Sequence, residues 1–399
     1  MNFNARIIHL ANAHDAAIEL NKIGCDRRGI HIMAPKAIFK TIKLEGIATK
    51  DANLLKQTFL AKGGEVAVSR GTADLSMDYT DVLICATLKQ YRMALAQLKL
   101  QPWGLPAIAR IVESLITEAT ESSGIQSEEN WWVKSDRTMV MGILNLTPDS
   151  FSDGGKYNQY DAALRHAEEM IREGADIIDV GAESTRPYGD AKKISAEEEM
   201  ERLLPLLERL ASVISVPISV DTYKAEVAAE AVKRGARMIN DIWGLQYDSK
   251  MAKVASTYNI PIVIMHNQEG TTYTRCIMSH ICEYLYRSVE IAMQAGIPRE
   301  NLIIDPGIGF GKTPKQNLLV MSRLEELKAI GCPILLGTSR KRFIGEVLDL
   351  PVEERVEGTG ATIAVGITKG VSIVRVHDVK AAVRVAKMTD AMIRSGGCE

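Results

Sequence analysis

The sequence predicts an α/β protein in which a (β/α)8 TIM barrel, residues 138–394, follows a small N-terminal mixed α/β (α+β) domain. Over residues 138–394, short apolar and β-branched stretches alternate with amphipathic stretches. This alternation is typical of βαβ units around a parallel sheet. The strand stretches are continuously apolar, as expected of strands buried on both faces. Eight such units in this length favour one closed barrel over an open sheet.

Each of the eight units contributes one strand and one helix. The predicted strands are Met139–Leu146, Ile177–Ala182, Pro217–Asp221, Met238–Ile242, Pro261–His266, Leu302–Asp305, Ile334–Thr338 and Ile373–His377. The predicted helices are Asp161–Glu173, Ala196–Ala211, Lys224–Arg234, Lys250–Tyr258, Glu283–Ala295, Lys315–Ile330, Thr359–Lys369 and Val379–Arg394. The β-branched composition of the former and the amphipathic pattern of the latter justify this division.

Residues 1–125 form a separate domain in this prediction, and residues 126–137 form a polar linker to the barrel. The predicted strands of the domain are Ala5–Leu10, Lys40–Glu45, Glu65–Ser69 and Asp81–Ala86. Its predicted helices are Asp15–Ile23, Lys50–Ala61, Lys89–Leu98 and Leu105–Glu118. No acidic metal pair or His/Asp/Cys constellation is found there, so we expect a non-catalytic domain that packs on the barrel or supports oligomerisation.

Composition excludes several classes of partner. Lys and Arg number 48 against 50 Asp and Glu, for a formal charge of −2, so no bulk charge favours nucleic acid or an anionic membrane. No apolar stretch approaches the ~20 residues of a membrane span, and the N-terminus lacks the layout of a signal peptide. The six cysteines form no CxxC pair and no zinc spacing. We therefore expect a cytoplasmic protein with reduced thiols.

Residues able to do chemistry stand where the predicted strands end. They are Asn145, Asp179, Glu183, Asp221, Asn240, Asp241, His266, Asp305, Ser339, Arg340, Lys341, Arg375 and His377. In a barrel the carboxyl ends of the strands form one face, and that face carries the active site. Two of them, Asp179 and Asp241, are expected to hydrogen-bond neighbouring loops rather than a ligand.

These residue types suit one kind of ligand. Asp221, Asn240 and Asp305 supply acceptors and an amide, which match a planar heterocycle with several N–H donors. Arg375 supplies a flat cation that can stack on such a ring and reach phosphate, and Lys341 supplies a second cation. No His/Cys cluster has the spacing of a transition-metal site. Mg²⁺ bridged to a substrate phosphate stays open, because Mg²⁺ keeps several waters.

Two loops follow the first two strands. Asn145–Gly155 is rich in Pro, Asp, Ser and Gly yet contains Phe151, and Ser184–Pro187 combines Thr185, Arg186 and a rigid proline. Such loops beside a site are typical of segments that grip a substrate. A third segment, Gly307–Thr313, ends like a phosphate-binding P-loop, but Pro306 stands where that motif needs glycine.

Five motifs in order make the barrel resemble the dihydropteroate synthase family. They are Asn145–Gly155, Gly181–Pro187, Asp305–Lys312, Ser339–Lys341 and Arg375–Val379, within a resemblance that covers residues 138–394. The resemblance implies a folate-pathway transferase that joins p-aminobenzoate to 6-hydroxymethyl-7,8-dihydropterin pyrophosphate, releasing pyrophosphate. It also implies Mg²⁺, a homodimer and a target of sulfonamides, with the response of this chain to sulfonamides left open.

The resemblance also implies a role for each matching residue. Those implied for binding of the pterin pyrophosphate are Thr185, Asp221, Asn240, Met265, Asp305, Lys341, Arg375 and His377. Those implied for the p-aminobenzoate pocket are Thr185, Arg186, Pro187, Phe310 and Arg342. Those implied for catalysis are Asp221, Lys341, Asp153 and Phe151, with Asn145 as the metal ligand. The implied mechanism is dissociative: the C–O bond breaks first, and Asp221 stabilises the cation under two closing loops.

One position departs from the family pattern. Many members have a small hydroxyl residue after the lysine that matches Lys341, and it helps to hold the p-aminobenzoate carboxylate; here Arg342 follows. Two other functions remain open at this stage. A pterin-binding methyltransferase that serves a corrinoid protein would share the Asp and Asn contacts but not the pyrophosphate residues. An inactive pterin-binding protein would lack residues of the loops or the strand ends.

Overall fold

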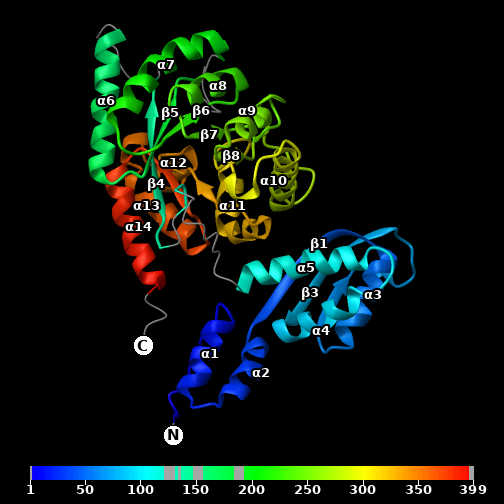
Figure 1. The fold of residues 1–399 in the computed structure, drawn as a ribbon. Coiled ribbons are helices and arrows are strands. Elements are labelled where there is room, and N and C mark those ends of the chain that lie inside the picture. The colour runs from blue at the N-terminus through cyan, green and yellow to red at the C-terminus, as the bar shows by residue number, and fades with distance from the viewer. Residues whose placement is uncertain (1, 121–130, 134–135, 147–155, 184–192, 395–399) are drawn as a thin grey trace. The chain divides into compact units, whose positions relative to one another are not determined.

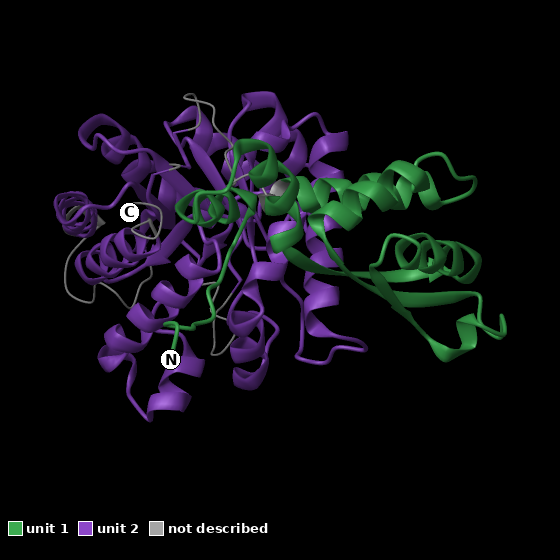
Figure 2. Cartoon of the chain, turned by 90° about the horizontal axis from the view of Figure 1, so that it is seen from below, with its two compact units in different colours: residues 1–124 green, residues 125–399 purple. Residues whose placement is uncertain are grey.

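A computed structural model describes residues 2–120, 131–133, 136–146, 156–183 and 193–394 (Figure 1). The chain divides into two compact units, residues 1–124 and residues 125–399 (Figure 2). Each unit has its own hydrophobic core. We call them unit 1 and unit 2.

Unit 2 is built on one eight-stranded parallel sheet. Its strands are β4 (Met139–Asn145), β5 (Ile177–Gly181), β6 (Ile218–Asp221), β7 (Met238–Asp241), β8 (Ile262–Met265), β9 (Leu302–Asp305), β10 (Leu335–Leu336) and β11 (Ile373–Val376). They follow the order β10-β11-β4-β5-β6-β7-β8-β9. A parallel bridge between Ile304 and Ile334 joins β9 to the segment that leads into β10, which closes the sheet into a barrel.

Helices surround this sheet (Figure 1). They are α6 (Lys156–Glu173), α7 (Ala196–Val213), α8 (Ala225–Lys233), α9 (Met251–Tyr258), α10 (Ile277–Gln294), α11 (Pro314–Ser322), α12 (Arg342–Leu348), α13 (Val356–Thr368) and α14 (Val379–Arg394). A 3-10 segment, Leu324–Ile330, follows α11. The last helix, α14, contacts α6 and β4, so the two ends of the barrel sequence meet. The predicted (β/α)8 barrel is confirmed.

The period of two along each strand divides the barrel core into layers. One set of alternate positions faces outward and packs under the helices, as Val140, Ile178 and Val220 do. The inward positions near the amino ends form an apolar cluster of Met139, Met141, Ile177, Met238, Val263, Ile303, Leu335 and Ile373. Further along, the inward positions become polar and carry Asp179, Ser219, Asp221, Asn240, Asp305 and Arg375. The barrel is therefore apolar at one end and charged at the other.

The predicted linker is wrong in its second half. Trp132 is only 7% exposed and belongs to the apolar cluster at the amino ends of the strands, with Trp131 and Val133 packed against it. Its indole nitrogen donates a hydrogen bond to the carbonyl oxygen of Glu300, 3.3 Å away. The two tryptophans are apolar enough to leave solvent, so this segment covers the floor of the barrel.

Unit 1 is a three-stranded antiparallel sheet with helices. Its strands are β1 (Phe39–Ala48), β2 (Glu65–Val68) and β3 (Tyr79–Thr87), in the order β1-β3-β2. Its helices are α1 (Ala13–Lys22), α2 (Arg27–Ala37), α3 (Thr49–Leu60), α4 (Leu88–Leu98) and α5 (Leu105–Thr120). Its core includes Phe59 and Tyr91, whose rings meet edge to face at 5.3 Å.

Two predictions for unit 1 are wrong. The segment predicted as the strand Ala5–Leu10 is neither strand nor helix, and Ile7 is 89% exposed. A strand needs a hydrogen-bonded neighbour, and among the described residues β1, at the edge of the sheet, pairs with β3 and not with this segment. Helix α2 was not predicted, because Gly29 and Pro35 break the helical pattern. Asp26 caps this helix by accepting hydrogen bonds from the backbone of Arg28 and Gly29.

Several helices of unit 2 also differ from the prediction. Helix α6 begins at Lys156 rather than Asp161, and the predicted helix Lys315–Ile330 is α11 followed by a 3-10 segment. Helix α10 begins at Ile277, ahead of the predicted start at Glu283. Helix α12 was not predicted, since its seven residues are too few to show a period. Within the described part of the chain, no helix combines the length and the apolar character that crossing a membrane requires.

The packing of Trp132 predicts a large loss of stability on truncation. A Trp132→Ala substitution should lower the free energy of unfolding by about 3–5 kcal/mol, because it opens a cavity in the barrel floor. Trp131→Ala, which removes a half-buried ring, should cost less. Urea denaturation of the full chain measures both. A Trp132→Ala variant within about 0.5 kcal/mol of the wild type, the range of surface substitutions, would contradict this account.

Candidate active site

Arg375 joins two buried carboxylates across the charged end of the barrel. Its Nε donates to Asp179 Oδ2 at 2.6 Å, and its Nη2 donates to Asp221 Oδ2 at 2.7 Å. The side chains of Asp179 and Asp221 are 0% and 6% exposed. Asn240 Nδ2 donates to Asp179 Oδ2 at 3.0 Å. Four inward side chains from β5, β6, β7 and β11 thus form one hydrogen-bonded group.

Lys341 lies beside this group, at the residue before α12. Its ammonium group donates to the carbonyl oxygen of Ile308 and lies 4.7 Å from the ring centroid of Phe310. Asp305, at the end of β9, accepts a hydrogen bond from the backbone N–H of Gly307 at 2.7 Å. Two cations and three carboxylates therefore share the carboxyl ends of the strands.

Burial is the largest influence on the pKa values of these groups. It raises the pKa of Asp221 to about 7, a shift that Arg375 opposes and Asp179 reinforces. Burial also raises the pKa of Asp305, against the attraction of Lys341, and lowers the pKa of Lys341 to about 8. For Arg375, burial acts to lower the pKa, but the carboxylates outweigh it and raise it. The site has the shifted groups that are typical of functional clefts.

The glycine-rich segment after β9 is held from inside by Lys312. The fully buried amino group of Lys312 donates to the carbonyl oxygens of Gly307 and Phe310, at 2.8 and 3.0 Å, and contacts His266 Nδ1 at 2.9 Å. Burial lowers the pKa of Lys312. Gly307 has φ +66°, and a Cβ there would lie 1.9 Å from the carbonyl oxygen of His266. The segment therefore follows the barrel wall closely, and its GKT ending serves packing rather than a P-loop.

An apolar wall borders the charged group. Tyr223, Ile242 and Met265 are buried together, and Trp243 and Phe310 pack against them. Met265 ends β8 and Phe310 lies in the segment after β9. The wall provides flat and apolar surface next to polar groups, as a pocket for an aromatic ligand requires.

The remaining predicted residues lie around this centre. His377 Nδ1 is 3.0 Å from Ser339 Oγ, which also accepts from the backbone N–H of His377. Asn145 is half-buried at the end of β4. Arg342 is exposed and pairs through Nε with Glu346 at 2.6 Å. Five predicted residues lie outside the described residues: Phe151, Asp153, Thr185, Arg186 and Pro187.

Two aspartates were expected to hold loops, and they differ. Asp241 accepts hydrogen bonds from the backbone N–H groups of Trp243 and Leu245, at 2.9 and 2.7 Å, so it does hold the turn after β7. Asp179 instead binds Arg375 inside the barrel. Asp179 stands two residues after Ile177 on β5, so both side chains point into the barrel. This spacing is the signal in the sequence that could have identified Asp179 as a residue of the site.

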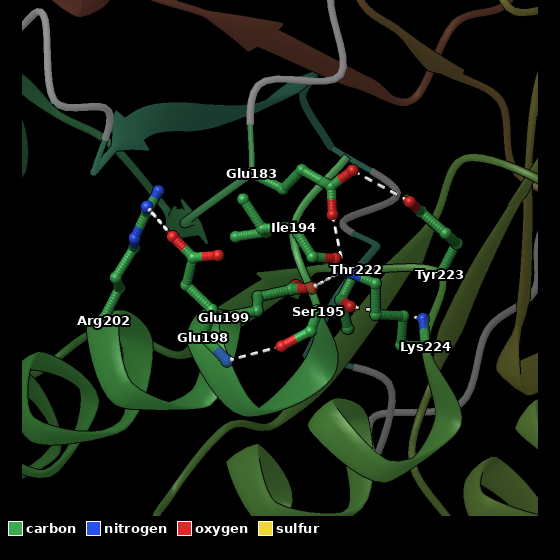
Figure 3. A network of polar contacts seen from close by, with 9 residues as sticks. All are labelled: Glu183, Ile194, Ser195, Glu198, Glu199, Arg202, Thr222, Tyr223 and Lys224. Carbon is green, nitrogen blue, oxygen red and sulfur yellow. Dashed lines mark hydrogen bonds and ion pairs between the residues drawn. The ribbon is translucent and has the colours of Figure 1, made fainter. Parts of the chain in front are cut away.

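Sequence reasoning missed a second charged group around Lys224 (Figure 3). Lys224 pairs with Glu183 and Glu199, and Tyr223 Oη donates to Glu183 Oε1 at 2.8 Å. Glu183 follows β5 and Lys224 follows β6. Glu183 had been named as a residue at a strand end. The position of Lys224, three residues after Asp221, was the further signal that could have identified this charged group.

Some buried polar atoms in the barrel have no hydrogen-bond partner among the described residues. They include Asp179 Oδ1, Ser219 Oγ and Asp221 Oδ1. A buried acceptor without a partner costs about 1–3 kcal/mol. The inward face of β5 and β6 therefore suits a ligand that brings N–H donors.

The pKa of Asp221 predicts a pH dependence of stability. Its folded-state pKa, about 7, lies above the ordinary value of 3.8, so the native state binds the extra proton between these values. The free energy of unfolding should then fall as pH rises through this window, by at most about 1.4 kcal/mol per pH unit, and level off above pH 7. Urea denaturation of the wild type and of Asp221→Asn from pH 5 to 8 measures this contribution. A difference between the two proteins that stays constant over this range would count against the raised pKa.

Comparison with known proteins agrees with this geometry. The family model described as "Pterin binding enzyme" matches residues 141–377. A dihydropteroate synthase of Bacillus subtilis is 59% identical over 262 residues, which cover 66% of this chain and 91% of that protein. A solved dihydropteroate synthase structure from Clostridium difficile, obtained in the presence of pteroic acid, has a TM-score of 0.63 at 52% identity. It covers 65% of this chain and 97% of its own.

One relative extends the likeness beyond the barrel. A probable bifunctional folylpolyglutamate synthase/dihydropteroate synthase of Halobacterium salinarum is 39% identical over 387 residues, which cover 94% of this chain and 46% of that protein. Residues 125–399 make up less than three quarters of the chain, so this match includes most of unit 1. The chain belongs to the pterin-binding enzymes, in the dihydropteroate synthase family of folate-biosynthesis transferases.

Proposed function

We propose that unit 2 condenses 6-hydroxymethyl-7,8-dihydropterin pyrophosphate with p-aminobenzoate, forming 7,8-dihydropteroate and pyrophosphate. The observation that carries this proposal is the pair of buried oxygens, Asp179 Oδ1 and Asp221 Oδ1, that have no partner among the described residues. They lie beside the Asn240 amide, on the inward face of the barrel. A pterin ring offers N–H and NH2 donors to these oxygens and acceptors to the amide.

The pterin would lie between the polar group and the apolar wall. Asp221, Asn240, Asp305 and Lys341 would bind its polar edge, Met265 would line the pocket, and Arg375 would stack on the ring. Support comes from the convergence of these side chains from β6, β7, β8, β9 and β11 on one end of the barrel. The fixed plane of the Arg375 guanidinium, held by two carboxylates, suits stacking.

The pyrophosphate would be bound by Asn145, Arg375 and His377. The guanidinium of Arg375 has five N–H donors, of which the two carboxylates take two. Among the described residues no group of three His, Cys, Asp or Glu could hold a metal. The donors fit Mg²⁺ held by the Asn145 amide oxygen, waters and the substrate's own oxygens. When bound, Mg²⁺ would neutralise charge on the leaving pyrophosphate.

The reaction we propose is dissociative. The C–O bond to pyrophosphate breaks first, and the electron-rich dihydropterin shares the positive charge left on its methylene carbon. Asp221 stabilises this cation electrostatically and does not act as a nucleophile. The weak aniline nitrogen of p-aminobenzoate then attacks this carbon, and the new C–N bond is completed when the nitrogen loses one proton to water or to the released pyrophosphate. Exclusion of water during this step, which we assign to the segments with Phe151, Asp153 and Thr185, prevents hydrolysis of the cation.

The p-aminobenzoate pocket would combine Phe310 with Thr185, Arg186 and Pro187. The position of Phe310 against Lys341 supports this. Arg342 pairs with Glu346 through Nε, and its guanidinium would supply the cation that holds the carboxylate of p-aminobenzoate. We propose that sulfonamides, which mimic p-aminobenzoate, compete in this same pocket.

We propose a cytoplasmic homodimer in which unit 1 is non-catalytic. Among the described residues, Cys25, Cys85, Cys276, Cys282 and Cys332 form no disulfide with one another, which supports a reducing compartment. Exposed apolar side chains on α13 and α14, among them Val365 and Met388, would be covered in a dimer. Light scattering tests the dimer, which should have twice the 43.8 kDa mass of one chain.

The direct test is release of pyrophosphate by the purified full chain. With dihydropterin pyrophosphate and Mg²⁺, release should depend on p-aminobenzoate and fall on the order of a hundredfold in Lys341→Ala, because a cation at the reacting centre is lost. Lys253→Ala, which removes an exposed lysine of α9, should behave as the wild type. A folded protein that binds the pterin but releases no pyrophosphate would contradict the proposal and favour an inactive pterin-binding protein.

Unit 1 should show no turnover of its own. A fragment of residues 1–130, incubated with the pterin substrate with and without p-aminobenzoate, should yield no product by chromatography. Any turnover by this fragment would overturn the non-catalytic role.

A further inference from the structure

Lys224 uses all three protons of its ammonium group. Its Nζ donates to Glu183 Oε2 at 2.5 Å, to Glu199 Oε2 at 2.6 Å and to the carbonyl oxygen of Ile194 at 2.8 Å (Figure 3). The ammonium carries three donors, so each acceptor takes one. A compact cation at the centre of three oxygens is a specific arrangement and not a loose surface pair.

The three acceptors come from two sides of one segment. Glu183 directly precedes residues 184–192, Ile194 comes two residues after them, and Glu199 lies in the first turns of α7. Lys224 itself follows Asp221, the last residue of β6, by three positions. One nitrogen atom therefore ties both flanks of residues 184–192 to the strand that carries Asp221.

The group is buried, which makes these bonds strong and their loss costly. The side chains of Lys224, Glu183 and Glu199 are 14%, 6% and 1% exposed. Burial acts to lower the pKa of Lys224, but Glu183 and Glu199 outweigh it and raise it. Burial raises the pKa of Glu199. Removing the cation would leave two buried carboxylates that repel each other, and they would move apart or take up a proton.

A second interaction keeps Glu183 in place. Tyr223 Oη donates to Glu183 Oε1, and the Tyr223 ring belongs to the apolar wall with Met265. Both oxygens of Glu183 are thus bound by consecutive residues, Tyr223 and Lys224. The carboxylate that begins the segment is fixed relative to the wall of the site.

We propose that Lys224 is a positioning residue for the reaction, which fixes both flanks of residues 184–192 relative to Asp221. This inference rests on the proposed function, which assigns Thr185, Arg186 and Pro187 of that segment to the p-aminobenzoate pocket. Among the described residues, the bonding partners of the Lys224 ammonium are Glu183, Ile194 and Glu199, and none of them is assigned to the pterin. Within residues 184–192, Thr185 is also implied in binding of the pterin pyrophosphate, as one of eight residues. Removal of Lys224 should therefore impair use of p-aminobenzoate far more than binding of the pterin, a split that a general loss of stability would not produce.

The test is Lys224→Met in the full chain, a substitution that keeps the length of the side chain and removes its charge. The KM for p-aminobenzoate should rise on the order of tenfold or more, since small displacements of a substrate-binding segment have effects of this size. The Kd for dihydropterin pyrophosphate, measured without p-aminobenzoate, should stay within about twofold of the wild type, well under the effect of a displaced segment. Lys233→Met is the matched control, because Lys233 is the last residue of α8, the helix that begins directly after Lys224, and makes an exposed pair with Glu230. It should change neither constant.

A second variant keeps the test decisive if Lys224→Met does not fold. Glu183→Gln preserves the shape of the side chain and an acceptor for Tyr223 but removes the charge that Lys224 binds. It should raise the KM for p-aminobenzoate in the same direction by a smaller factor. An unchanged KM in a folded variant, or a Kd for the pterin that rises as much as the KM, would overturn the role of Lys224. A wild type without p-aminobenzoate-dependent release would instead overturn the proposed function.

Discussion

The pairing of one arginine with two buried carboxylates determines the inside of this barrel. Arg375 from β11 reaches Asp179 on β5 and Asp221 on β6, and these strands lie on either side of β4 in the sheet. A buried carboxylate without a partner is unfavourable by several kcal/mol, and so is a buried guanidinium. Each charge therefore requires the others, and three strands must keep their register for the group to form. The apolar floor around Trp132 supplies the stability that offsets this polar layer.

Buried lysines repeat this solution in the loops above the strands. Lys312 binds the carbonyl oxygens of the segment after β9 from inside, and Lys224 binds both flanks of the segment after β5. In both places a lysine that is not itself assigned to the pterin determines where the neighbouring loop residues lie. The proposed reaction requires fixed loop residues, because a cation formed before the nucleophile attacks must be held in a fixed geometry. Arg375 and Asp221 belong both to the frame and to the proposed binding residues, whereas Lys224 and Lys312 belong to the frame alone.

Much of the barrel could be predicted from the sequence, because continuous apolar strands and amphipathic helices leave a strong local pattern. Even β10 was found, although only Leu335 and Leu336 pair as a strand, since the apolar stretch around them is longer. The pattern failed where structure depends on distant partners. Trp132 lies in a polar stretch and is buried because it packs on the apolar cluster at the amino ends of the strands. Helix α2 forms in spite of Gly29 and Pro35, because it packs on the core of unit 1 through Ala34.

The polar residues of the site divide in the same way. Asp221, Asn240, Asp305, Lys341 and Arg375 could be named because each is a polar residue at the end of a predicted strand, and three of them also stand in the motifs of the family. Their contacts with one another could not be predicted, because the partners of Arg375 depend on the stagger of the strands. The sequence did not identify Asp179 as a site residue or Lys224 as a positioning residue. An aspartate or a lysine at the end of a strand is common and gives no specific signal.

The most direct test of this account is the affinity for dihydropterin pyrophosphate without p-aminobenzoate, measured by titration calorimetry on the wild type and on Arg375→Met. If Arg375, held by Asp179 and Asp221, stacks on the pterin ring, the Kd of the folded variant should rise at least roughly thirtyfold. The reason is that truncating a buried charge partner costs about 2–5 kcal/mol. A folded Arg375→Met variant with the wild-type Kd would contradict the account, since the charged group would then serve the fold alone.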